Sequence, residues 1–85
     1  MYYTYILRSE KFPDQTYVGS TSDLRKRLTE HNAGKSIHTN KFKPWELMVY
    51  VASRERPAAE QFERYLKKGS GRAFARRHLL TPQGS

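Results

Sequence analysis

The fold of this chain is decided by residues 17–31, which read YVGSTSDLRKRLTEH. A short aromatic and β-branched run is followed, after a glycine, by a segment of helical pattern over about residues 22–32. Thr21 or Ser22 is placed to cap this helix, and Asp23 lies favourably against its dipole. The stretch therefore predicts the end of a strand, a turn and a capped helix.

One face of the predicted helix carries two leucines and two ionisable residues. Leu24, Arg27, Leu28 and His31 follow one another at spacings of three and four, so their side chains share one arc. Because the leucines are the apolar residues available to pack on a sheet, Arg27 and His31 are expected to point inward with them. The solvated face is predicted to carry Arg25, Lys26, Thr29 and Glu30.

A second helix is expected over about residues 57–68, where Ala59, Phe62 and Leu66 form an apolar arc. Glu63 falls in the middle of this arc, and a carboxylate there is costly unless it is paired or bound to a cation. A structural alternative is a half-buried salt bridge between Glu63 and Arg27. The functional alternative is an active site shared by the two inward faces.

The remaining pattern predicts a small α+β (α/β) domain in the order β-β-α-β-α-α, with a three-stranded, mainly antiparallel sheet flanked by helices. Gly19, near a strand end, indicates a close backbone approach or an unusual φ. Residues 69–71, GSG, are expected to break the chain before the last helix. The expected strands are 2–8, 16–20 and 45–52, with a basic loop at 35–43, a last helix at 72–80 and a flexible tail at 81–85.

Length and charge restrict the partners. The 85 residues predict one domain over residues 1–80, and the net charge of +8 favours nucleic acid, with an anionic membrane surface second. The chain has no cysteine and no long apolar run, which excludes a disulfide framework and a membrane span and agrees with a cytoplasmic location.

The inward side chains suit phosphodiester cleavage. A carboxylate such as Glu63 can hold one hard cation, Mg²⁺ or Mn²⁺, together with waters. The arginine can bind phosphate oxygens, the histidine can orient or relay a proton, and tyrosines on the neighbouring strands, Tyr5 and Tyr17, can act on the attacking water.

These residues resemble the GIY-YIG nuclease family, in particular its small stand-alone bacterial members. Tyr17-Val18-Gly19 matches the second half of the signature. Tyr3-Thr4-Tyr5 matches the first half loosely, because the usual glycine is absent there. The segments DLRKRLTEH and AAEQFERYLKK resemble those that carry the family's arginine, histidine and glutamate. The resemblance covers about residues 2–68.

The resemblance implies a role for each residue. Tyr5 is the candidate base, and Tyr17 is its partner. Arg27 is expected to bind the phosphate, and Glu63 is expected to bind a single divalent metal. His31 is expected to lie beside them. We expect the five side chains to line one groove. The asparagine that some members place after the glutamate helix has no counterpart in residues 64–85.

The leading hypothesis is therefore a metal-dependent DNA endonuclease, structure-selective and linked to DNA repair or processing. A non-catalytic nucleic-acid-binding module and a basic protein-interaction domain are the alternatives. Single-stranded or branched DNA is the expected partner, with a protein partner or a second copy as further partners. The residues expected to contact nucleic acid are Lys26, Lys35, His38, Lys41 and Lys43.

Overall fold

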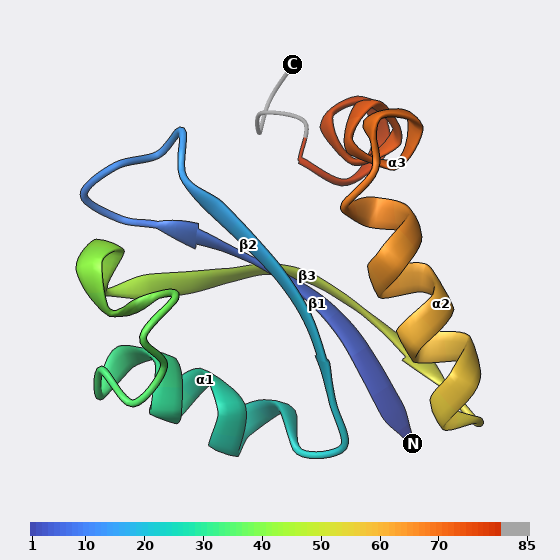
Figure 1. The fold of residues 1–85 in the computed structure, drawn as a ribbon, viewed down its shortest axis with the longest axis horizontal. Helices are drawn as coiled ribbons and strands as arrows, with labels where there is room; N and C mark the ends of the chain where they lie inside the picture. The colour runs from blue at the N-terminus through green and yellow to red at the C-terminus, as the bar shows by residue number, and fades with distance from the viewer. Residues whose placement is uncertain (81–85) are drawn as a thin grey trace.

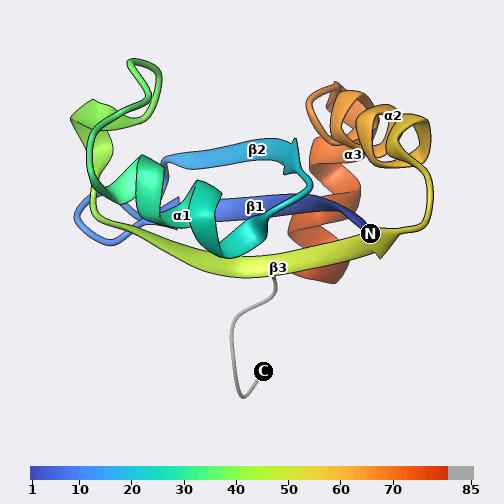
Figure 2. The same ribbon diagram turned by 90° about the horizontal axis from the view of Figure 1, so that it is seen from below.

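A computed structural model describes residues 1–80, and three antiparallel strands lie at its centre. The strands are β1 (Tyr2–Ser9), β2 (Thr16–Thr21) and β3 (Trp45–Ser53), arranged in the order β2-β1-β3 (Figure 2). Both pairings are antiparallel, and Tyr5 of the central strand lies opposite Gly19 of β2. This confirms the predicted sheet, and it places the two tyrosine motifs on adjacent strands.

Helices cover both faces of this sheet (Figure 1). On one face, Leu24 and Leu28 pack against Tyr5 and Leu7, and on the other, Leu66 packs against Ile6. Side chains alternate along a strand, so the two cores lie on opposite sides of β1. The helices are α1 (Leu24–Asn32), α2 (Arg56–Leu66) and α3 (Gly69–Phe74), which continues as a π-helical turn over Ala75–Leu79.

The predicted order of elements is confirmed, but some helix boundaries were wrong. Helix α1 begins at Leu24 because the side chain of Asp23, rather than Thr21 or Ser22, caps it by accepting from the backbone N–H of Lys26 at 3.1 Å. The basic loop contains a short 3₁₀ turn, Asn40–Phe42.

The GSG segment is the first turn of α3 rather than a break. Helix α2 ends at Leu66, and the chain changes direction at Lys67 and Lys68. Gly71 is buried, and a Cβ built on it would collide with the backbone carbonyl of Tyr65. This glycine therefore permits close packing between α2 and α3 instead of ending a helix.

None of the helices within residues 1–80 is long and apolar enough to cross a membrane. The predicted flexible tail, residues 81–85, lies outside the described residues.

Candidate active site

Three buried side chains form a hydrogen-bonded chain between the sheet and the loop after α1. The hydroxyl of Tyr5 lies 3.0 Å from Nε2 of His31, and Nδ1 of His31 lies 2.7 Å from Oγ1 of Thr39. The carbonyl of Thr39 in turn accepts from the indole N–H of Trp45 at 2.8 Å. All four residues are at most 3% exposed, so both ring nitrogens of His31 are engaged within a rigid setting.

Gly19 makes room for the Tyr5 ring. Of the two explanations that the sequence left open, the structure favours close approach, because within residues 1–80 Gly34 is the residue with a positive φ. A Cβ built on Gly19 would lie 2.5 Å from the Tyr5 hydroxyl oxygen and 3.1 Å from the Tyr17 ring. The glycine of the YVG motif is thus required by the tyrosine that lies across from it.

Tyr17 completes an aromatic cluster with Tyr5 and His31. Its ring centroid lies 5.0 Å from that of His31 and 6.4 Å from that of Tyr5. Tyr17 is only partly buried, whereas Tyr5 is 2% exposed. Tyr17 therefore offers the larger surface to a substrate, and Tyr5 can reach one through only a small part of its side chain.

Burial sets the protonation states of this cluster. It raises the pKa of Tyr5 to about 12, although the neighbouring Arg27 guanidinium opposes the shift. Burial also lowers the pKa of His31 below its ordinary value, and the positive charge of Arg27 reinforces this effect. At neutral pH the site therefore holds a protonated phenol beside a neutral imidazole, which can accept a proton.

Arg27 lies beside this cluster and is held by α1 itself. Its guanidinium donates to the Glu30 carboxylate at 3.1 Å, and the two side chains are 34% and 26% exposed. The prediction that Glu30 belongs to the solvated face was wrong, because a spacing of three residues brings it back to Arg27. The alternative of a salt bridge between Arg27 and Glu63 is wrong as well, since each has a different partner.

Glu63 projects from α2 toward the edge of β2. Its carboxylate accepts from the Ser20 hydroxyl at 2.6 Å and from the Lys67 ammonium at 2.7 Å. Burial alone would raise the pKa of Glu63, but the two hydrogen bonds together with the positive charges of Lys67 and Arg64 outweigh it and hold the pKa below its ordinary value. The carboxylate is therefore ionised at neutral pH, and at 22% exposure it still reaches solvent.

The donor set around Glu63 fits a cation that keeps most of its water. No group of three His, Asp or Glu side chains gathers within residues 1–80, so a closed protein cage for a metal is absent there. An ionised carboxylate beside the Ser20 hydroxyl suits Mg²⁺, which is commonly bound through one or two carboxylates plus phosphate and water. Lys67 neutralises the same carboxylate, and its side chain is about half exposed, at 49%.

Lys67 also connects the two halves of the site. Its Nζ lies 5.9 Å from the centroid of the Tyr17 ring while it binds Glu63. The charges of both Arg27 and Glu63 act on the Tyr5 phenol. The structure thus brings the five predicted residues near one another. Tyr17 also lines a hollow of about 520 Å³ at the edge of β2, and the groove common to all five stays a prediction.

Sequence reasoning missed three residues of this site. Lys67 lies four residues after Glu63, a spacing that predicts a helical ion pair. Ser20 follows the YVG motif directly, but its partner lies 43 residues away. Thr39 carried no signal, because it comes from a loop without periodic pattern and is buried only through tertiary packing.

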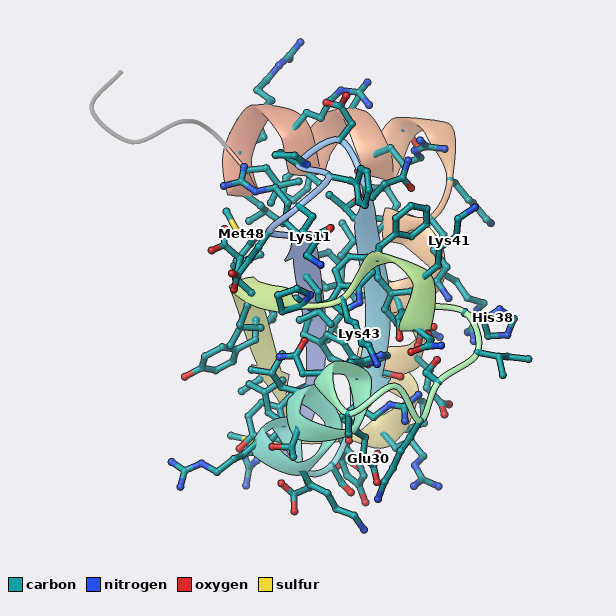
Figure 3. The ribbon with its side chains drawn as sticks, turned by 90° about the vertical axis from the view of Figure 1, so that its left-hand side faces the viewer. Lys11, Glu30, His38, Lys41, Lys43 and Met48 are labelled. Carbon is teal, nitrogen blue, oxygen red and sulfur yellow. The ribbon has the colours of Figure 1, made fainter. Side chains whose placement is uncertain are left out.

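The residues predicted to contact nucleic acid lie on α1 and on the loop after it. Lys26, Lys35, His38, Lys41 and Lys43 are all exposed. Figure 3 shows His38 and Lys41 on the loop before β3, and Lys43 turned back toward α1. A Cβ on Gly34, just beyond α1, would lie 2.8 Å from the Lys43 ammonium, so this lysine covers the end of the helix.

Comparison with known proteins gives a consistent result. The family model described as the GIY-YIG catalytic domain matches residues 1–77. The chain is 40% identical over 68 residues to the Structure-specific endonuclease subunit slx1 of Talaromyces stipitatus, a match covering 73% of this chain and 18% of that protein. The corresponding protein of Candida dubliniensis is 39% identical over 85 residues, covering 92% and 28%. The chain thus spans less than a third of these relatives.

Bacterial relatives match over most of their length. A UPF0213 protein of Streptococcus pyogenes is 35% identical over 83 residues, which cover 95% of this chain and 87% of that protein. The solution NMR structure of a UPF0213 protein from Bacillus halodurans superposes with a TM-score of 0.56 at 27% identity, covering 99% and 89% of the two chains. These matches confirm the predicted likeness to small bacterial members and the predicted fold.

Proposed function

The chain belongs to the GIY-YIG nuclease family, and on that premise we propose that it is an endonuclease that hydrolyses phosphodiester bonds in DNA with one divalent metal. The observation that carries the proposal is the hydrogen-bonded chain from Tyr5 through His31 to Thr39, which lies next to an ionised carboxylate and an arginine. DNA is the proposed substrate because the net charge is +8 and two relatives are named structure-specific endonuclease subunits.

In this proposal the proton of the attacking water moves onto Tyr5. A phenol with a pKa of about 12 does not act as a preformed phenolate at neutral pH. No preformed phenolate is needed in the relay. Tyr5 donates its hydroxyl proton to Nε2 of His31, and the Tyr5 oxygen accepts a proton from the attacking water at the same time. His31 can accept the Tyr5 proton when Nδ1 carries the hydrogen and donates to Thr39. The resulting hydroxide attacks phosphorus, and the O3′–P or O5′–P bond opposite breaks. The leaving oxygen takes a proton from solvent, and His31 and Tyr5 release the proton of the attacking water to solvent, which restores the relay.

Arg27 and Glu63 serve the phosphate in this proposal. The Arg27 guanidinium, one-third exposed, binds non-bridging phosphate oxygens, and Glu30 holds it in place. Glu63 would hold the metal with Ser20 beside it, and a bound Mg²⁺ or Mn²⁺ supplies charge neutralisation of the phosphate and of the leaving oxygen. Tyr17, the more exposed tyrosine, orients the water. The proposed substrate is branched or single-stranded DNA, and the proposed setting is DNA repair in the cytoplasm.

The test is incubation of purified protein with plasmid, branched and single-stranded DNA, each with Mg²⁺, with Mn²⁺ and with EDTA. We expect cleavage with metal only, and its loss in Glu63→Ala and Arg27→Ala. Variants that cut as well as the wild type would remove these residues from the site.

A second candidate function is a nucleic-acid-binding module that keeps the fold without turnover. The absence of asparagine from residues 64–85 favours it, because part of the catalytic set of some family members is then missing. Salt-sensitive DNA binding without any metal-dependent product would establish this alternative.

A further inference from the structure

The hollow beside Tyr17 has the composition of a nucleotide site. It encloses about 520 Å³ between the start of β2 and the helices α2 and α3, which lie along the same side of the sheet (Figure 1). Ligand pockets typically measure about 300–1,000 Å³, so one nucleotide fits. Its lining includes four cations and one carboxylate, contributed by Arg8, Lys67, Arg72, Arg76 and Asp14.

Two of these cations are available to a ligand. Arg8 donates to Glu46 and Lys67 to Glu63, so their charges are partly satisfied within the protein. Arg72 and Arg76 are exposed, and neither is ion-paired within residues 1–80. They are four residues apart on one continuous helical segment, and both residues line the same hollow.

The floor of the hollow is apolar and rigid. Its accessible apolar surface comes from Val18 and Leu80, which are partly buried and pack against Ile6 and Leu66, each 2% exposed, in the core between the sheet and the helices. An apolar floor with arginines at the rim suits a base and its phosphates together, whereas the faces of the bases in double-stranded DNA are stacked inside the duplex and cannot lie on such a floor.

We propose that this hollow binds an unpaired nucleotide next to the scissile phosphate, with its base on the apolar floor and its phosphates on Arg72 and Arg76. The inference rests on the proposed function for the position of the cut. Because Tyr17 and Lys67 line the hollow and also lie in the catalytic cluster, a strand seated there passes directly into the active site. A substrate with an unpaired stretch at the cut is therefore preferred over an intact duplex.

The experiment measures binding in EDTA, where no cleavage takes place. Fluorescence anisotropy compares a 12-nucleotide oligo-dT strand with a 12-base-pair blunt duplex for the wild type and two double variants. Arg72→Gln with Arg76→Gln removes the free rim cations. Lys68→Gln with Arg77→Gln is the matched control, because these two exposed cations, one at the N-cap of α3 and one on the helical segment, lie outside the lining of the hollow.

The rim variant is expected to bind the single strand at least about tenfold more weakly than the control variant does. Its slope of log K against log salt should fall by about 1.4, that is about 0.7 for each lost phosphate contact. Duplex binding should fall equally in the two variants. The proposal would be overturned if both variants lost single-strand affinity equally, or if the rim variant lost affinity only for the duplex.

This outcome is independent of catalysis. If the protein never cuts DNA but the rim variant selectively loses single-strand binding, the nucleotide site is supported and the proposed endonuclease activity is rejected. If the protein cuts DNA but the rim and control variants lose single-strand affinity equally, the proposed endonuclease activity is supported and the nucleotide site is rejected.

Discussion

Tyr5 has a structural and a proposed catalytic role. Its ring packs in the core, and its hydroxyl forms a hydrogen bond with His31. We expect Tyr5→Phe to keep the fold and to lower cleavage by at least about 100-fold, since the proton relay ends at the missing oxygen. Leaving Nε2 of the buried His31 unpaired should also cost about 1–3 kcal/mol in the free energy of unfolding. DNA cleavage and urea denaturation measure the two effects.

Tyr3→Phe is the matched control for this change. Tyr3 lies on the same face of the same strand, and its ring packs against Tyr50 outside the candidate site. It should leave cleavage within about threefold of the wild type. If Tyr5→Phe cleaves as well as Tyr3→Phe, Tyr5 is not in the proton path, and Tyr17 takes its place as the candidate base.

Lys67 neutralises the carboxylate that is proposed to hold the metal. Because cation and ammonium compete for the same oxygens, Lys67→Met should tighten Mn²⁺ binding, by up to about fivefold for a half-exposed ion pair. Electron paramagnetic resonance of free Mn²⁺ measures the affinity directly. Lys68→Met removes the same charge from the neighbouring exposed position. An equal change in both variants would show a general charge effect in place of competition at Glu63.

At the scale of elements, the contact between α2 and α3 depends on one glycine. Gly71→Ala should lower the free energy of unfolding by about 1–3 kcal/mol, because its methyl group meets the backbone of Tyr65. Gly69→Ala, in the same turn with open space around it, should be neutral or stabilising by up to about 1 kcal/mol. Urea denaturation of both variants tests this, and equal effects would contradict the packing described for α3.

The elements near the signature were predictable because their patterns are local. A period of three to four residues placed Leu24, Leu28 and His31 on the buried face of α1, and it raised the question of Glu63 on α2. The GSG segment was misread because a glycine that ends a helix and a glycine that lets two helices touch look alike in sequence. Only the position of Tyr65 distinguishes them.

The sequence predicted which residues lie in the site better than it predicted their hydrogen-bond and ion-pair partners. Arg27 was expected to lie inward, and the spacing of three residues allows its ion pair with Glu30 but does not by itself select Glu30 as the partner. The contact of Glu63 with Ser20 joins elements far apart in the chain, and Thr39 enters from an irregular loop. Such contacts are products of tertiary packing, which a single sequence does not display.

At the scale of the whole molecule, acid should destabilise the protein through His31. Its pKa in the folded state is lower than the value of 6.5 for the unconstrained group, so the unfolded state binds the proton more readily. The free energy of unfolding should therefore decrease as the pH falls below about 6.5. Glu63 behaves differently, because its lowered pKa stabilises the fold above about pH 4.5, and that contribution is lost only in stronger acid.

Urea denaturation between pH 7 and pH 5 measures this dependence. His31→Gln should flatten the curve in this range, whereas His38→Gln, which changes an exposed histidine, should retain the wild-type slope. A wild-type slope in His31→Gln would show that His31 is not the group that titrates on unfolding.

The most direct test of the central claim compares two glutamates of α2 in the presence of metal. Glu63 lies in the site, whereas Glu60 is exposed one turn earlier and has no part in the catalytic cluster. Cleavage of branched DNA is followed for the wild type, Glu63→Gln and Glu60→Gln with Mg²⁺, with Mn²⁺ and with EDTA. We predict metal-dependent cleavage that Glu63→Gln reduces by at least about 100-fold and that Glu60→Gln leaves unchanged. Cleavage by Glu63→Gln at the wild-type rate, or equal rates with EDTA, would contradict the account.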